Sequence, residues 1–150
     1  MISLSDQPFD VATVLREFEL SVKGAGAIVT FTGTVRPQTT GEAVKTLYLQ
    51  AYSPMTETGI GEAVRTAKAR WNLISVRIIH RIGEIPPGDP IVFVATASAH
   101  RRAAFEAADF LMDYLKTEAI FWKKETSASG AKWIEPRLED YSDRARWTER

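Results

Sequence analysis

The sequence predicts an α+β fold within one domain. Apolar residues recur at helical spacing in three segments, and runs rich in β-branched residues are mixed with those segments along the chain. A chain of 150 residues with 45% hydrophobic content can bury one core without disulfides or a structural metal. No repeat, low-complexity tract or linker-like stretch divides the sequence, so we expect residues 1–150 to form one domain.

The N-terminal segments predict a short strand and then a capped helix. The initial strand is expected at residues 2–4, and Asp10 has a side chain that is favoured at a helix N-cap. The apolar residues that follow at helical spacing are Val11, Val14, Leu15 and Phe18. We expect this helix to end before Gly24.

Two strands are expected next. Residues 25–35 are rich in β-branched side chains and end at Arg36-Pro37, which places Arg36 at the end of a strand. Residues 44–52 alternate enough in polarity to form the neighbouring strand. Between them, the glycine- and threonine-rich residues 39–41 are typical of a loop tip.

The dipeptide Ser53-Pro54 predicts the start of a second helix. Serine offers a capping hydroxyl, and proline is favoured at the first helical position. The amphipathic pattern that follows extends to about Trp71. Gly59 and Gly61 weaken the first turns of this helix, because glycine has low helix propensity.

Two further strands are expected at residues 74–82 and 90–98. They are joined through Pro86-Pro87-Gly88-Asp89, whose prolines and glycine suit a tight reversal. We therefore expect the two strands to pair antiparallel.

The last predicted elements are a helix and a hairpin. The helix runs from about His100 to Glu118, and its predicted buried residues are Phe105, Ala108, Met112 and Leu115. Residues 120–126 and 132–135 then predict the two strands of a hairpin.

Composition argues against several classes of function. Nineteen basic and nineteen acidic residues cancel, so bulk charge favours neither a nucleic-acid binder nor a membrane-surface binder, and any anion site must be local. Cysteine is absent, which excludes disulfides, thiolate metal sites and a thiol nucleophile on this chain. Any sulfur chemistry therefore needs a sulfur atom supplied by a partner.

The sequence also gives no sign of a metal centre or of membrane insertion. The two histidines, His80 and His100, lack carboxylates at metal-binding spacing, so we expect no metal and no resident cofactor. No segment approaches the roughly 18 consecutive apolar residues of a membrane span, and the N-terminus lacks the layout of a signal peptide. We expect the protein to be cytoplasmic.

The predicted helix start at His100 has features that favour an anion. Arg101 and Arg102 lie in the first turn, where the positive end of the helix dipole disfavours cations. Free backbone N–H groups beside an imidazole and a guanidinium group would suit a phosphate or a carboxylate. The alternative is a solvated, mildly unfavourable helix end, since no glycine-rich cradle precedes the helix.

Four basic residues near the other end of that helix and in the strands have ordinary structural explanations. Lys116 lies in the last helical turn, where a cation complements the helix dipole. Lys123 and Lys124 follow on a strand and must point to opposite faces, but the pattern does not say which one faces inward. His80 lies between apolar strand residues and is expected to be a packed or surface histidine outside the site.

Two rival functions belong to other classes. A noncatalytic binding module would use the basic residues to dock an acidic partner or a polyanion. A single-stranded nucleic-acid binder would use the aromatic and lysine-rich strand 121–124 as a stacking platform, with Phe31 and Trp122 as the aromatic residues least explained by core patterns. The cancelled net charge argues against the second rival.

Six stretches of the sequence carry a family resemblance. They are Phe31-Thr32-Gly33-Thr34-Val35-Arg36, Tyr52-Ser53-Pro54-Met55-Thr56-Glu57, His80-Arg81-Ile82-Gly83-Glu84, Ser98-Ala99-His100-Arg101, Asp113-Tyr114-Leu115-Lys116 and Phe121-Trp122-Lys123-Lys124-Glu125. Together they resemble the large, catalytic subunit of molybdopterin synthase, the MoaE family, over nearly the whole chain. One departure is Ile120, where the family often has proline, so the entry angle of the Lys123 strand is expected to differ slightly.

The resemblance implies a fold, partners and a reaction. The fold would be of the α/β hammerhead type, and the large subunit would form a homodimer with a small ubiquitin-like subunit at each end. The C-terminal glycine of the small subunit would carry sulfur as a thiocarboxylate. Two sulfurs would pass to cyclic pyranopterin monophosphate and form the dithiolene of molybdopterin. The missing cysteine agrees with this external sulfur source.

The resemblance also implies roles for individual residues. Lys116 and Lys123 would be catalytic, through either proton transfer or a transient covalent bond. Arg36, His100 and Arg101 would hold the pterin and its phosphate. The full implied set of substrate-binding residues is Thr34, Val35, Arg36, His100, Arg101, Lys116, Lys123, Lys124, Glu125 and Arg137.

Helix geometry separates two members of this set. Arg101 and Lys116 are 15 residues apart, so on one continuous helix they lie about 22 Å apart along the axis. One small pterin cannot touch both. We therefore expect a composite active site, with Lys116 and Lys123 from one subunit and His100 and Arg101 from its dimer mate.

Overall fold

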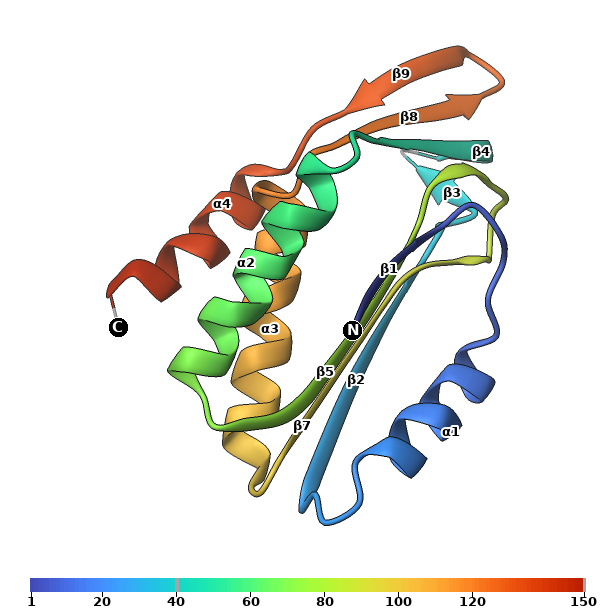
Figure 1. Cartoon of the computed structure of the whole chain (residues 1–150). Coiled ribbons are helices and arrows are strands. Elements are labelled where there is room, and N and C mark those ends of the chain that lie inside the picture. The colour runs from blue at the N-terminus through green and yellow to red at the C-terminus, as the bar shows by residue number, and fades with distance from the viewer. Residues whose placement is uncertain (40, 150) are drawn as a thin grey trace.

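The computed structural model describes residues 1–39 and 41–149, in which strands and helices are mixed as an α+β fold requires (Figure 1). This arrangement confirms the predicted fold class. In chain order the elements are β1 (Ile2–Ser5), α1 (Val11–Ser21), β2 (Ala27–Thr34), β3 (Gln38–Thr39), β4 (Glu42–Ala51), α2 (Met55–Arg70), β5 (Leu73–Arg81), β6 (Gly83–Ile85), β7 (Pro90–Ser98), α3 (Arg101–Thr117), β8 (Phe121–Ser127), β9 (Gly130–Ile134), α4 (Leu138–Ala145) and the 3₁₀ helix η1 (Arg146–Glu149).

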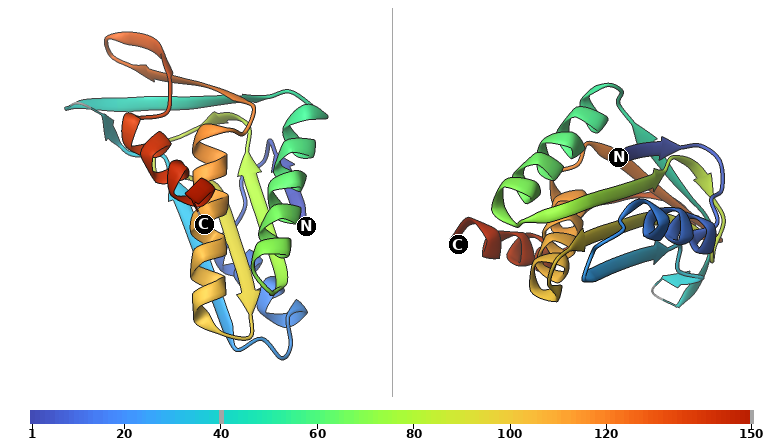
Figure 2. Two further views of the ribbon diagram at one scale, coloured as in Figure 1. Left: turned by 90° about the vertical axis from the view of Figure 1, so that its left-hand side faces the viewer. Right: turned by 60° about the horizontal axis from the view of Figure 1, so that its bottom comes forward.

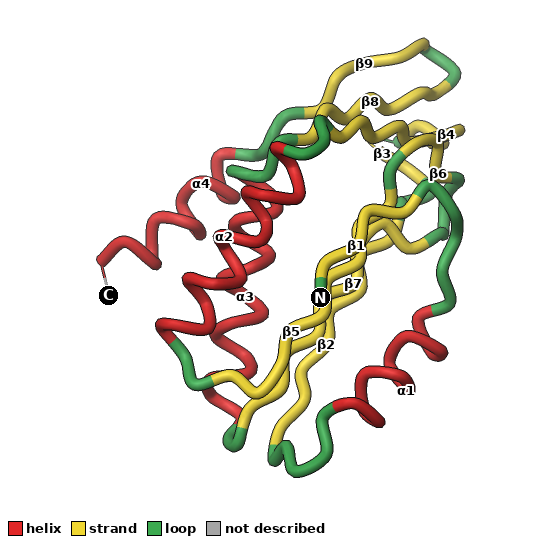
Figure 3. The backbone as a smooth tube through the Cα atoms, viewed as in Figure 1, coloured by secondary structure: helices red, strands yellow, loops and turns green. Residues whose placement is uncertain are grey.

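The first sheet has the strand order β1-β5-β7-β2 and helices on both faces. Strand β1 runs parallel to β5, whereas β7 pairs antiparallel with both β5 and β2. The antiparallel pairing predicted for residues 74–82 and 90–98 is therefore confirmed. Helices α2 and α3 cover one face of this sheet and α1 covers the other (Figures 1 and 3).

Alternation along the central strands divides the apolar core between these two faces. On β5, Ile78 packs with the α2 and α3 side, and its neighbour Ile79 packs with Phe18 and the α1 side. Because successive strand residues point to opposite faces, a continuous apolar run fills both layers. The helices are thus fixed on the sheet by burial of apolar surface on each side.

A second sheet, with the order β3-β4-β8-β9 and β6 paired to β4, lies at one end of the first (Figure 2). The hairpin predicted near residues 120–135 is confirmed as β8 and β9. The prediction that residues 44–52 neighbour residues 25–35 is wrong, since β2 pairs with β7 and β4 pairs with β8. The apolar residues of β4 instead belong to a separate cluster with Ile85.

The predicted N-cap is confirmed for α1 but not for α2. The Asp10 carboxylate accepts a hydrogen bond from the Thr13 backbone N–H at 3.2 Å and caps α1 as predicted. Ser53 does not cap α2, because its hydroxyl donates to the Glu57 carboxylate at 2.7 Å and Pro54 occupies the N-cap position. The predicted loop tip at 39–41 includes Thr40, which lies outside the described residues.

The predicted burial of Phe105 is wrong, because its side chain is 60% exposed. The buried apolar stripe of α3 consists of Ala104, Ala107, Ala108, Leu111 and Leu115. Phe105 follows the first of these residues by one position, which rotates it about 100° away around the helix. Among the described residues, no helix is long and apolar enough to cross a membrane.

Candidate functional site

A cavity of about 510 Å³ lies where the end of α3 meets the ends of both sheets. Its volume falls within the roughly 300–1,000 Å³ typical of small-molecule sites. The residues that line it are Phe31, Thr32, Gly33, Thr34, Arg36, His80, Ile91, Val92, Met112, Leu115, Lys116, Lys123, Ile134, Glu135, Pro136, Arg137 and Asp140. Segments far apart in the chain therefore meet around one space.

The end of β2 brings Thr34 and Arg36 to this cavity but turns Val35 away from it. Val35 is buried in the cluster with Val44, and its backbone N–H donates to the Asp89 carbonyl at 3.0 Å. Since alternate side chains of an extended segment point to opposite sides, a buried Val35 leaves the residues on either side of it free to line the cavity. Thr34 and Arg36 are both exposed there.

The two candidate catalytic lysines reach the cavity from different elements. Lys116 comes from the last turn of α3 and Lys123 from β8, where Lys123 is paired with Leu49 on one side and Ile134 on the other. Burial and, after it, the positive charge of Lys116 lower the pKa of Lys123 to about 8, against the opposing effect of Asp140. A neighbouring cation and a desolvated amine are the usual means of making a lysine reactive.

Lys124 faces the opposite side of the same strand. Its ammonium group lies 6.0 Å from the ring centroid of Tyr48 and 5.6 Å from that of Trp133. This decides the question that the sequence pattern left open, because Lys123 is the inward lysine. Glu125 does not line the cavity, and its carboxylate accepts a hydrogen bond from the Thr39 hydroxyl at 3.0 Å.

The start of α4 supplies a paired cation and anion to the cavity wall. The Asp140 carboxylate accepts hydrogen bonds from the Arg137 backbone N–H at 2.8 Å and from its guanidinium group at 3.3 Å. Burial alone would raise the pKa of Asp140, but these hydrogen bonds and the charge of Lys116 leave that pKa lowered. The sequence did not predict Asp140 at the site, because α4 itself was not predicted. Glu135 falls at the end of the predicted strand 132–135 but was not assigned to the site.

His80 also lines the cavity, although the sequence placed it outside the site. Its side chain is only 3% exposed, and its ring stacks on Phe121 with 4.2 Å between the ring centroids. Burial lowers the pKa of His80 to about 4, and the charges of Lys123 and Lys116 act in the same direction. The sequence signal was its position on the strand face that also carries Val76 and Ile78, where a histidine replaces an apolar residue.

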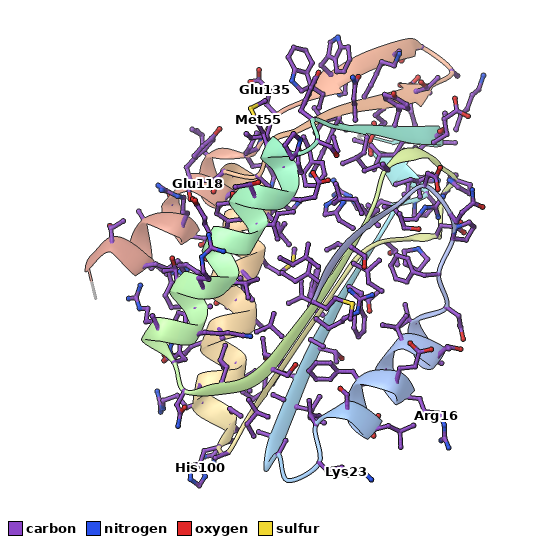
Figure 4. The ribbon with its side chains drawn as sticks, in the orientation of Figure 1. Arg16, Lys23, Met55, His100, Glu118 and Glu135 are labelled. Atoms are coloured by element: carbon purple, nitrogen blue, oxygen red, sulfur yellow. The ribbon has the colours of Figure 1, made fainter. Side chains whose placement is uncertain are left out.

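His100 and Arg101 lie at the opposite end of α3. They line a separate hollow of about 440 Å³ with Arg102, Phe105 and Glu106. Figure 4 shows His100 far from Glu135, which lies at the wall of the larger cavity. His100 is the N-cap residue of α3 but makes no side-chain capping bond. Within one chain, the predicted site residues therefore form two groups.

The composition of the cavity suits an anionic organic ligand more than a metal ion. Four cationic side chains line it, namely Arg36, Lys116, Lys123 and Arg137. Within residues 1–39 and 41–149, no three histidine or carboxylate side chains are grouped so that they could hold a metal. Guanidinium groups can bind phosphate through two hydrogen bonds, and ammonium groups attract it as point charges.

Comparison with known proteins decides the family. The family model described as MoaE protein matches residues 4–118. The molybdopterin synthase catalytic subunit of Pseudomonas aeruginosa is 45% identical over 148 residues, which cover 99% of this chain and 99% of that protein. The chain belongs to the MoaE family, the catalytic subunits of molybdopterin synthase.

Solved structures of MoaE proteins share the fold as well. The molybdopterin biosynthesis MoaE protein from Burkholderia ambifaria superimposes with a TM-score of 0.83 at 39% identity, covering 99% of this chain and 97% of that one. The fold expected from the family resemblance is thereby confirmed. A complex of subunits 1 and 2 of molybdopterin-converting factor from Helicobacter pylori matches with a TM-score of 0.77 at 18% identity, over 91% of each chain.

Proposed function

We propose that this chain transfers sulfur from the C-terminal thiocarboxylate of a small ubiquitin-like subunit to cyclic pyranopterin monophosphate in the cavity lined by Lys116 and Lys123. The observation that carries the proposal is the partly buried Lys123, whose pKa is lowered to about 8 beside a second lysine. Family membership supplies the reaction class. The absence of cysteine agrees with a sulfur atom carried by the partner.

The chemistry requires three tasks of the protein. The phosphate must be held, the thiocarboxylate must be directed at a side-chain carbon of the pterin, and protons must move as oxygen leaves that carbon. In each transfer a C–S bond forms on the substrate as a C–O bond there breaks. Water then cleaves the bond between the sulfur and the carrier's acyl carbon, which leaves the sulfur on the substrate and a carboxylate on the carrier. Arg36 and Arg137, which line the cavity, would hold the anionic groups of the substrate.

The two lysines are proposed to share the reactive steps. Lys116 acts as the principal acid and base or as a transient covalent group, and Lys123 acts beside the spent carboxylate. A pKa of about 8 leaves part of Lys123 as free amine near neutral pH, so Lys123 can accept a proton there. Lys124 and Glu125 do not line the cavity, so we propose that they support the site indirectly, through the strand β8 that carries Lys123.

We propose further that each active site is completed by the dimer mate. His100 and Arg101 would enter the cavity of the other subunit and hold the substrate phosphate, because within one chain they line a different hollow. A two-fold symmetric dimer places the same pair of contacts at both sites. We also propose that residues 1–150 act as one domain and that the protein works in the cytoplasm.

The direct test is reconstitution of the reaction. Purified protein is mixed with cyclic pyranopterin monophosphate and a thiocarboxylated small subunit, and the dithiolene product is followed by mass spectrometry. Lys116→Ala and Lys123→Ala are each expected to reduce the rate by at least about 100-fold, the usual range for loss of an acid–base group. Lys23→Ala is the control, because Lys23 is exposed beyond the end of α1 (Figure 4).

The outcomes separate the proposal from its rivals. A bound small subunit with no product from the wild-type protein would support the noncatalytic binding module. Binding of oligonucleotides that weakens steeply with salt would support the nucleic-acid function. Full activity of both lysine variants would refute the assignment of the cavity.

A further inference from the structure

His80 lies on β5 at a position that the strand pattern reserves for an apolar side chain. The preceding residues on the same face, Val76 and Ile78, are buried against α2 and α3. His80 is paired across the sheet with Val92, which also lines the cavity. Burying a polar ring at the end of an apolar stripe is costly unless its nitrogens form hydrogen bonds, so both ring nitrogens of His80 should have partners.

One ring nitrogen of His80 has a partner that fixes the tautomer. Nδ1 lies 2.9 Å from the backbone carbonyl oxygen of Arg81. A carbonyl oxygen only accepts hydrogen bonds, so Nδ1 must carry the hydrogen. In the neutral ring, Nε2 is then left with a lone pair and acts only as an acceptor.

The ring is also fixed in orientation. Phe121 stacks on it with an interplanar angle of 22°. The hydrogen bond to Arg81 restrains the ring along one edge, while the stacked ring restrains its plane. A side chain held by two such contacts presents Nε2 in one direction without further loss of rotamer freedom on binding a ligand.

The charged groups around His80 keep its ring neutral. Lys116 faces it from α3 and Lys123 from β8, and Arg81 follows it on β5. The carboxylate of Asp140, on α4, is engaged with Arg137. Burial and the two lysine charges all oppose a positive charge on the imidazole, whose pKa is about 4. His80 is therefore an uncharged acceptor in a cavity whose lining includes four cationic side chains and the two carboxylates Glu135 and Asp140.

Nε2 has no hydrogen-bond partner among the described residues. Because His80 lines the cavity, this nitrogen is open to water or to a ligand there, and such an acceptor is normally satisfied by one of them. Lys116, Lys123, Arg36 and Arg137, which line the same cavity, are all donors and suit the anionic parts of a ligand. The N–H and O–H groups of a pterin are donors, so they need hydrogen-bond acceptors in the cavity.

We infer that Nε2 of His80 accepts a hydrogen bond from an N–H or O–H group of the bound pterin and so sets which edge of the substrate faces Lys123. This role rests on the proposed function, because it requires that the substrate occupies this cavity. It makes His80 a substrate-orienting residue that neither donates nor removes a proton in the reaction.

Two substitutions separate this role from a structural one. Asparagine can replace Nδ1 and keep the hydrogen bond to Arg81, but it leaves nothing at the position of Nε2. Glutamine reaches the position of Nε2 with an amide oxygen but loses the bond to Arg81. We expect His80→Asn to weaken binding of cyclic pyranopterin monophosphate by about 10-fold or more, and His80→Gln to stay within about threefold of the wild type.

Binding is measured by calorimetry with the pterin alone, so turnover is not needed. Thermal unfolding of each variant checks that it is folded. Tighter binding by His80→Asn than by His80→Gln would overturn the inference and assign the histidine to holding Arg81. Equal weakening in both variants would also overturn it.

A second measurement uses the wild-type protein and does not depend on how the variants fold. The chain has two histidines, so ¹⁵N-histidine labelling gives few ring signals, and His100→Gln assigns them. The Nε2 signal of His80 is expected to shift on addition of the pterin, as it does when a bare nitrogen accepts a hydrogen bond. A bound pterin with an unchanged Nε2 signal would refute the role of His80 alone, whereas a pterin that does not bind at all would refute the proposed function.

Discussion

Lys123 and Lys124 are adjacent residues of one type that the fold places in different surroundings. Lys123 is enclosed at the cavity and has a lowered pKa, while Lys124 lies over the rings of Tyr48 and Trp133 on the other face. The difference follows from the pleat of β8, because successive side chains point to opposite faces. At the scale of the residue, the reactivity of a lysine on β8 therefore depends on which face of the strand its side chain occupies.

Removal of the neighbouring charge tests this electrostatic account. Lys116→Met is expected to raise the pKa of Lys123 above 8 toward its ordinary value, because the charge of Lys116 is the second cause of the lowering after burial. The pKa is read from an NMR titration of ¹³C-labelled lysine side chains. Lys23→Met is the control and should leave that pKa unchanged. An unaltered pKa in Lys116→Met would show that the two ammonium groups do not interact.

At the scale of the element, α2 contains a glycine that lowers helix propensity but is required by the close packing of α2 against α3. The glycine at position 59 lies against α3, where an added methyl group would come within 2.5 Å of the Tyr114 hydroxyl oxygen. At Gly61 the nearest atoms would be 3.8 Å and 3.9 Å away, which is ordinary contact. The sequence suggested only a cost in helix propensity at both positions, and the contact between helices distinguishes them.

The two glycines give a matched pair of substitutions. Gly61→Ala is expected to stabilise the protein by about 1 kcal/mol through helix propensity. Gly59→Ala is expected to destabilise it by about 1–3 kcal/mol, because the tyrosine must move. Both values are free energies of unfolding measured with urea. In a Tyr114→Phe background the cost of Gly59→Ala should disappear, and a persistent cost there would mean that the hydroxyl is not the obstacle.

At the scale of the whole molecule, the two groups of predicted site residues occupy opposite ends of α3. The helix of 17 residues is a rigid spacer, so no side-chain movement brings Arg101 to the cavity of Lys116 in the same chain. A dimer removes this difficulty if the start of α3 in one subunit meets the end of α3 in the other.

Mixed dimers test this arrangement. Arg101→Ala and Lys116→Ala chains are each expected to be nearly inactive alone. If they are unfolded and refolded together, half of the dimers are mixed, and each mixed dimer has one intact composite site. The mixture should then recover about one quarter of the wild-type rate, since half of the sites in half of the dimers are complete. No recovery in a verified mixed population would place all the essential residues within one chain.

The sequence by itself determined the three longer helices and the longer strands, the capping by Asp10, the hairpin that carries Lys123 and the need for an external sulfur atom, but not α4. These features depend on local periodicity, on turn chemistry and on which functional groups the chain contains. Its long motifs also pointed to the correct family.

Only the tertiary structure decided which strands pair, which lysine faces the cavity and that His80 lies beside it. Several strands present apolar faces of similar quality, so alternation fixes the two faces of a strand but not the element that covers each face. That choice depends on contacts between residues distant in sequence, as where β8 reaches β4 and Phe121 comes to stack on His80. The chemistry of the site arises from those contacts, because they set burial and charge around groups that are ordinary in the sequence.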